Sequence, residues 1–133
     1  MPETEPLSSF YGITVQIKLQ SRIDSKSELR EAIEMIHTKV QLAGKQADGY
    51  VIPLGKVNLV NVVTDVGMVG CGAFDVAALN NFDYPAARVK PTRGSSIATI
   101  DDLLDGLIKD ANSAATRLGI KVGMSGKEAL DLL

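Results

Sequence analysis

The only cysteine of the 133-residue chain, Cys71, lies between Gly70 and Gly72, where an apolar run gives way to a helix-like segment. A thiolate becomes a useful nucleophile when its pKa is lowered, and a following helix start can lower it. The backbone N–H groups of Gly72 and Ala73 could then hold an anion or a developing oxyanion. We therefore predict Cys71 as the candidate catalytic residue, and Gly70, Gly72, Ala73 and Asp75 as candidate ligand-binding residues.

The same motif has a second interpretation, in which the cysteine and the glycines serve packing. Free cysteine is among the most buried residue types, and the motif contains no general base. Glycines permit close backbone approach to a ligand or simply to a neighbouring strand. The spacing Gly-x-x-Gly-x-Gly that begins at Gly67 matches neither a dinucleotide fingerprint nor a Walker loop. The sequence therefore leaves a reactive thiol, a pocket floor and a packed turn open.

Other residues with chemical potential are few. One histidine, His37, and one cysteine are too few nitrogen and sulfur ligands for zinc, so we predict no metal and no cofactor. Asp101 and Asp102 suit the first turn of a helix, where the helix dipole stabilises negative charge. Ser125 is followed by Gly126 and has no histidine after it, which argues against a hydrolase nucleophile.

Composition limits the classes of partner. Sixteen acidic and fourteen basic residues give a net charge of −2, and the chain has no Trp, three Phe and three Tyr. Such a chain has no general attraction to phosphate backbones and few rings for base stacking, so we expect no nucleic acid partner. The basic residues Arg88, Lys90 and Arg93 could bind a small anion or be solvated. We expect no membrane partner and a cytoplasmic location, because no long apolar run or secretory leader is visible.

Hydrophobic periodicity predicts the elements of the first half. Residues 1–9 are expected to be a disordered tail, and the alternating residues 13–19 predict a strand. The capping-box pattern at Ser25 and the apolar spacing up to Ala43 predict a helix over residues 25–43. Three Val-rich runs over residues 50–54, 57–64 and 67–71 predict an antiparallel meander. Pro53 cannot donate to a ladder, which indicates an edge position for the first run.

The second half predicts mostly helices, in an order typical of an α+β fold with a several-stranded, mainly antiparallel sheet, covering helices and a single domain. The expected elements are a short helix over 75–80 capped by Asp75, a strand over 86–90, a helix that begins at Thr99, a helix over 109–118, and a terminal helix with a Ser125–Glu128 capping box.

Four ordered blocks of the sequence resemble the YunC-like family of small bacterial and archaeal proteins, a domain of unknown function. They are Leu54 with Asn58-Leu59, then Cys71 to Val76 with Leu79-Asn80, then Thr99 to Leu104, and finally Ala114-Ala115, Leu118 to Ile120 and Gly123 to Leu130. The resemblance implies an N-terminal β region that serves for tetramerisation, followed by an α/β portion. It covers residues 49–133 and leaves residues 10–48 as an N-terminal strand and helix extension.

From these patterns and the resemblance we expect a homo-oligomer, with a tetramer favoured, that binds or regulates through a small-molecule ligand. The alternative is a small cysteine-dependent enzyme that uses Cys71 as its nucleophile. A purely structural assembly partner is a third possibility. Catalysis requires a base within hydrogen-bond reach of the thiol, whereas binding requires only a concave pocket.

Overall fold

The computed structural model describes residues 35–133. The predicted tail, the predicted strand over residues 13–19 and most of the first predicted helix lie outside the described residues. In chain order the elements are β1 (Ile36–Gln41), β2 (Gln46–Pro53), β3 (Asn58–Val63), β4 (Met68–Gly70), α2 (Val76–Leu79), the 3-10 turn η2 (Asn80–Phe82), β5 (Ala86–Lys90), α3 (Ile100–Asp105), β6 (Leu107–Ala111), α4 (Ser113–Arg117) and α5 (Gly126–Asp131).

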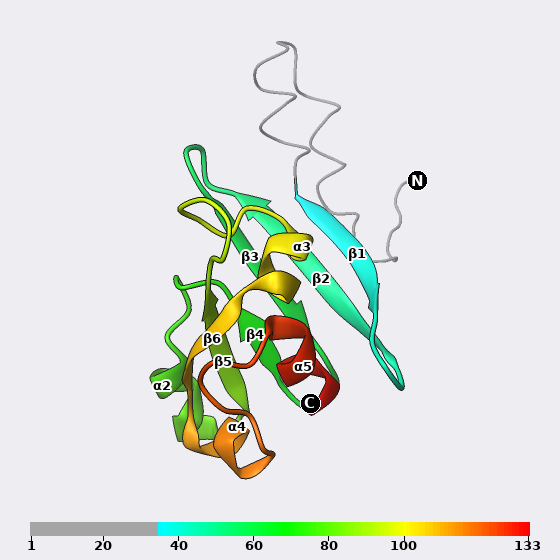
Figure 1. Ribbon diagram of the computed structural model, residues 1–133, viewed down its shortest axis with the longest axis vertical. Helices are drawn as coiled ribbons and strands as arrows, with labels where there is room; N and C mark the ends of the chain where they lie inside the picture. Colours follow the sequence, from blue (N-terminus) through cyan, green and yellow to red (C-terminus); the bar gives the residue numbers. More distant parts are fainter. Residues whose placement is uncertain (1–34) are drawn as a thin grey trace, which may run out of the picture.

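The six strands form one sheet in the order β1-β2-β3-β4-β5-β6, so each strand pairs with its neighbour in sequence. All pairs are antiparallel except β4 and β5, which are parallel because α2 and η2 carry the chain back along the sheet. The predicted α+β class, with a mainly antiparallel sheet and covering helices, is confirmed (Figure 1).

The predicted meander is present as β2, β3 and β4, but the edge position predicted from Pro53 is wrong. β2 lies between β1 and β3. The β1–β2 register runs only as far as Ile36 opposite Val51, so Pro53 extends beyond β1 and pairs with Asn58 alone. A missing N–H costs nothing at a strand end that has no neighbour on that side among the described residues.

The predicted helix over residues 25–43 is wrong where the structure describes it, because Ile36–Gln41 is the strand β1. Ile36 and Val40 are four residues apart, which fits one helical turn, but Ile36, Thr38 and Val40 also alternate along one face of a strand. β-branched residues favour strands, and six residue pairs with β2 settle the choice.

The predicted helix over residues 109–118 is correct only in its second half. Leu107–Ala111 forms the strand β6 against β5, with Ile108 fully buried. α4 begins after Asn112, whose side-chain oxygen accepts a hydrogen bond from the Ala115 N–H. The helix therefore starts four residues later than predicted, at a typical N-cap residue.

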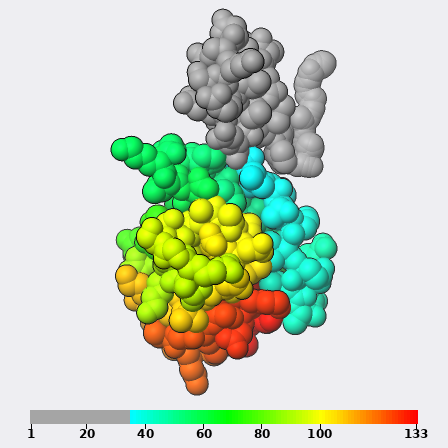
Figure 2. Space-filling model, turned by 45° about the horizontal axis from the view of Figure 1, so that its top comes forward, coloured from blue at the N-terminus to red at the C-terminus, as the bar shows by residue number. Residues whose placement is uncertain are grey.

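The main hydrophobic core lies between the sheet and the helices α3 and α5, which pack on the same face (Figure 1). In the space-filling view the α3 segment, in yellow, fills the centre of the visible face, with β1 and β2 beside it and the C-terminal residues below (Figure 2). The fully buried side chains include Leu103 of α3 and Leu130 of α5. Burying each such side chain contributes about 1.5–3 kcal/mol.

A smaller core lies on the opposite face, where α2 covers β4 and β5. It consists of Met68, Val76 and Ala86, with Tyr84 packed against it. Because side chains alternate along a strand, Met68 and Gly70 face α2, while the residues between and after them face the main core. This alternation decides which residues of the glycine-rich motif, the Gly-x-x-Gly-x-Gly segment that begins at Gly67, share a face.

The three helix caps predicted within residues 35–133 are all present. Asp75 caps α2 by accepting from the Ala78 N–H. Thr99 and Asp102 form a capping box at α3, and Ser125 and Glu128 form another at α5. Ser125 is therefore a capping residue, as its neighbours predicted.

Candidate functional site

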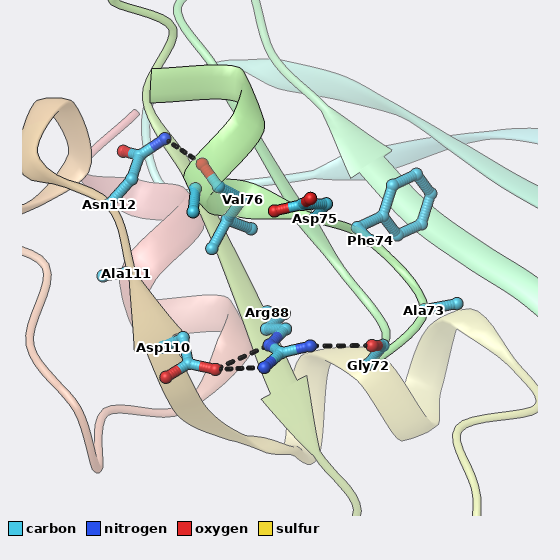
Figure 3. A pocket seen from close by; sticks show the side chains of 10 residues that line it. Gly72, Ala73, Phe74, Asp75, Val76, Arg88, Asp110, Ala111 and Asn112 are labelled. Atoms are coloured by element: carbon cyan, nitrogen blue, oxygen red, sulfur yellow. Dashed lines mark hydrogen bonds and ion pairs between the residues drawn. The ribbon is translucent and has the colours of Figure 1, made fainter. Parts of the chain in front are cut away.

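A cleft of about 470 Å³ opens on the α2 face of the sheet, beside the point where the chain leaves β4. Three segments line it: residues 72–77 from the turn and the first residues of α2, Arg88 from β5, and residues 110–112 from the end of β6 (Figure 3). These segments are far apart in the sequence and meet because β4, β5 and β6 are neighbours in the sheet.

Arg88 is the central charged residue of the cleft. The β5–β6 register places it opposite Asp110, and the guanidinium Nε donates to Asp110 Oδ2 over 2.6 Å. Arg88 Nη2 lies 2.6 Å from the same oxygen, and Nη1 donates to the Gly72 carbonyl over 3.0 Å (Figure 3). The Arg88 side chain is 30% exposed, so it is partly withdrawn from water but still open to a ligand.

The glycines of the motif have different roles. A Cβ at Gly70 would lie only 2.4 Å from Cδ2 of Phe74, so Gly70 makes room for the aromatic ring. A Cβ at Gly72 would meet no heavy atom within 4 Å, and the φ of Gly72 lies outside the left-handed region. Packing within the described residues therefore explains Gly70 but not Gly72.

Cys71 does not line the cleft. It is only 6% exposed and belongs to the main core, on the face of β4 that also carries Val69. Its N–H donates to the Val60 carbonyl over 3.0 Å, which continues the β3–β4 pairing by one residue. The structure thus brings Gly72, Ala73 and Asp75 together at the cleft and places Cys71 and Gly70 away from it.

The other candidate residues also lie apart from the thiol. His37 lies on β1, where its ring stacks on Tyr50 with centroids 4.8 Å apart and Nε2 is 2.9 Å from Asp48 Oδ1. Two strands separate β1 from β4. Arg93, predicted with Arg88 as part of a basic loop, pairs instead with Asp105 over 2.8 Å.

Asn112 is an important residue of the site that sequence reasoning missed. Its Nδ2 donates to the carbonyls of Val76 and Tyr84, both over 2.9 Å. Its Oδ1 accepts from the N–H groups of Ala86 and Ala115. These four bonds use the full capacity of the amide and tie α2, β5 and α4 together behind the cleft. Its place before Ser113, as an N-cap type, was the available signal.

The cleft has an excess of negative charge. Arg88 supplies one positive charge, whereas Asp75 and Asp110 each supply a negative one. Asp75 uses Oδ1 to cap α2, and Asp110 uses Oδ2 for Arg88. No contact within residues 35–133 occupies the second oxygen of either carboxylate.

Among the described residues, no group of three His, Cys, Asp or Glu side chains is arranged to hold a metal ion. No helix within residues 35–133 has the length and apolar character needed to cross a membrane.

Comparison with known proteins agrees with this α+β architecture. The model of the family described as "Domain of unknown function (DUF1805)" matches residues 70–133. The chain is 40% identical over 93 residues to the uncharacterized protein YunC of Bacillus subtilis (strain 168), covering 70% of this chain and 91% of YunC. The chain therefore belongs to the YunC-like family that carries this domain.

A solved structure supports the fold independently. The crystal structure of a protein of unknown function from Thermoplasma acidophilum superposes with a TM-score of 0.64 at 24% identity. The match covers 73% of this chain and 90% of the archaeal chain. At this level of identity the similarity concerns the fold alone.

Proposed function

We propose that this protein is a homo-oligomeric binding or regulatory protein whose small-molecule ligand occupies the cleft lined by residues 72–77, Arg88 and residues 110–112. The carrying observation is the cleft itself. Its volume of about 470 Å³ lies within the range of about 300–1,000 Å³ that is typical of small-molecule sites. Its walls combine apolar side chains with one arginine and two carboxylates, the mixture that binds and orients a small ligand.

Binding is better supported than thiol chemistry. Nucleophilic catalysis needs an exposed thiolate with a base in reach, but the Cys71 side chain is buried in the core on the opposite face of β4. The residues that line the cleft include no described histidine, lysine or cysteine. Their arrangement offers hydrogen bonds and charge to a ligand.

Gly72 supports the binding proposal because packing within the described residues does not explain why this position is a glycine. A Cβ there would meet no described atom within 4 Å, and the φ of Gly72 lies outside the left-handed region. A glycine at this point adds no side chain to the lining of the cleft, and its carbonyl accepts a hydrogen bond from Arg88. A larger residue at position 72 should therefore obstruct the cleft without disturbing the fold.

The test maps binding on ¹⁵N-labelled protein with a panel of small fragments followed by amide chemical shifts. We expect saturable shifts concentrated at residues 72–77, Arg88 and residues 110–112. Gly72→Leu should abolish them. Gly44→Leu is the matched control, since Gly44 is equally unobstructed but lies in the β1–β2 turn. Shifts that are absent from these residues for the whole panel, or that survive Gly72→Leu unchanged, would reject the cleft as the ligand site.

The homo-oligomer, with a tetramer favoured, forms through the β1–β3 part of the sheet. The register places Tyr50 and Ile52 on one face, and both are only half-buried; Leu59, opposite Ile52, is half-buried and also packs against the main core. At the tip of the β2–β3 hairpin, Leu54 is 58% exposed and Val57 is 56% exposed. Apolar side chains gathered on one sheet face and its hairpin are typical of a surface that another subunit covers.

A further inference from the structure

We infer that the cleft selects a small zwitterion with an apolar body, bound through its carboxylate by Arg88 and through its ammonium group by Asp110 and Asp75. This inference rests on the proposed ligand-binding function and names the ligand's chemical class. The observations that carry it are the hydrogen-bond donors and acceptors inside the cleft that have no partner within the described residues.

The donors are on Arg88. A guanidinium carries five N–H groups, one on Nε and two on each Nη. Nε and one N–H of Nη2 are directed at Asp110 Oδ2, and one N–H of Nη1 is directed at the Gly72 carbonyl. One N–H on Nη1 and one on Nη2 remain. Two donors on neighbouring nitrogens match the two oxygens of a carboxylate.

The acceptors are on the two aspartates. Asp110 is held by Arg88 through Oδ2 only, and Asp75 is held by Ala78 through Oδ1 only. Both side chains line the same cleft as Arg88 (Figure 3). Their second oxygens can accept hydrogen bonds from an ammonium group, which carries three donors and no acceptor.

The charges of the cleft favour a zwitterion over three other classes of ligand, namely phosphate esters, simple amines and simple carboxylates. A phosphate ester would bring further negative charge to a cleft that already has one excess negative charge. A simple amine would satisfy the aspartates but leave the two free N–H groups of Arg88 without an acceptor. A simple carboxylate would leave the aspartates without a cation. Of these four classes, the zwitterion alone offers an oppositely charged partner both to Arg88 and to the aspartates.

Apart from the charged residues and from Asn112, whose amide is already bonded to protein backbone groups, the side chains of the lining are apolar, so we expect the ligand to have an apolar body. Ala73, Phe74, Val76 and Ala111 contribute to the walls between the charged residues. L-Leucine is therefore the probe, because it joins a carboxylate and an ammonium group to a branched aliphatic chain. L-Leucinamide, 4-methylpentanoate and phenyl phosphate are its controls, lacking respectively the carboxylate, the ammonium group and the zwitterion.

The experiment measures dissociation constants for the four probes by amide-shift titration of the full chain. We expect L-leucine to bind at the cleft, and L-leucinamide and 4-methylpentanoate to bind at least about tenfold more weakly, as the loss of a charged hydrogen-bonded partner predicts. Equal affinity of L-leucinamide would overturn the role of Arg88, and equal affinity of 4-methylpentanoate would overturn the role of the aspartates. Tighter binding of phenyl phosphate, or no binding of L-leucine, would overturn the zwitterion.

Two variants separate ligand contact from a purely structural role. Arg88→Lys should weaken the binding of L-leucine and of 4-methylpentanoate, because lysine cannot present two parallel donors to a carboxylate. It should leave the binding of L-leucinamide unchanged. Asp110→Asn should weaken the binding of L-leucine and of L-leucinamide, and it should leave the binding of 4-methylpentanoate unchanged. Arg93→Lys, whose arginine pairs with Asp105 outside the cleft, is the matched control. If each variant lost affinity for all probes equally, Arg88 and Asp110 would have a structural role alone, and this result would contradict the inference.

The two proposals fail in distinguishable ways. If fragments shift the cleft residues and Gly72→Leu abolishes the shifts, but L-leucine shows no preference over its controls, the cleft is a ligand site of another chemical class. If no fragment shifts the cleft residues, the binding function itself is rejected.

Discussion

At the scale of single residues, the glycine-rich motif divides its residues between two faces of β4. Met68 and Gly70 face α2, whereas Val69 and Cys71 face the main core. The thiol and the ligand-binding candidates are adjacent in sequence, but the alternation of a strand separates them in space. Proximity along the chain was therefore a poor guide to which of these residues act together.

Cys71 should be protected from thiol reagents in the native protein. Its side chain is buried in the main core, so alkylation requires local or global unfolding. We expect no labelling by iodoacetamide at pH 7.5 over an hour, and one label per chain in denaturant. Rapid stoichiometric labelling of the folded protein would instead restore Cys71 as a candidate nucleophile.

Gly70 and Gly72 should respond oppositely to alanine substitution. Gly70→Ala forces a Cβ to within 2.4 Å of the Phe74 ring and should lower the free energy of unfolding by about 1–3 kcal/mol. Gly72→Ala enters open space and should change it by less than about 0.5 kcal/mol. Urea unfolding of the two variants measures both values. Equal destabilisation by the two substitutions would show that Gly72 serves packing as well.

Long-range partners at this scale could not be predicted from the sequence. Arg88 and Asp110 are 22 residues apart, and Asn112 bonds Val76 across 36 residues. Such pairs depend on the order of the strands, which no local pattern encodes. Gly72, Ala73 and Asp75, which were predicted as ligand-binding residues from their types, do line the cleft.

At the scale of elements, helix caps could be predicted from the sequence, because one side chain accepts a hydrogen bond from one nearby backbone N–H. The Ser125–Glu128 capping box and the caps at Thr99 and Asp75 could be predicted because donor and acceptor are three residues apart. Residues 36–41 and 109–111 were misread as helix, and only pairing with β2 and β5 selects the strand.

The capping box of α3 should make stability depend on acid. The Ala98 N–H, helped by the Thr99 side chain and N–H and the Arg93 charge, holds the pKa of the Asp102 carboxyl below its usual value. Because the pKa is lower in the folded state, the ionised form contributes stability above the unfolded pKa of about 3.9. That contribution disappears as the pH falls through the folded pKa.

Asp102→Asn tests this dependence. The variant should have a lower urea midpoint than the parent at pH 7, and the difference should narrow as the pH falls below about 4. Asp101→Asn is the matched control, since Asp101 lies in the same first turn outside the capping box. A difference between parent and Asp102→Asn that stays constant from pH 7 to pH 3 would contradict the assigned role of the ionised carboxylate.

At the scale of the whole molecule, one continuous sheet joins β1 and β2 to the rest of the domain. The division at residue 48 into an extension and a YunC-like domain stays a prediction, but β2 (Gln46–Pro53) spans that point without a break. The residues that line the cleft and those of the half-buried β2–β3 face lie at different places on this sheet. Assembly and ligand binding can therefore be tested separately.

Light scattering coupled to size exclusion should give a mass of four times the chain mass of 14.1 kDa. Ile52→Lys places a charge on the half-buried face of β2 and should shift the protein toward smaller species. Lys127→Glu on α5, an exposed residue of the opposite face, should leave the mass unchanged. A monomeric mass for the parent at micromolar concentration would contradict the oligomer.

The measurement that tests the central claim most directly is the affinity of the tightest-binding fragment for three proteins: the parent, Gly72→Leu and Gly44→Leu. Calorimetric titration should give the same dissociation constant for the parent and Gly44→Leu, and a loss of at least about tenfold for Gly72→Leu, with unfolding midpoints equal in all three. Equal affinity in all three proteins would contradict the assignment of the cleft as the ligand site.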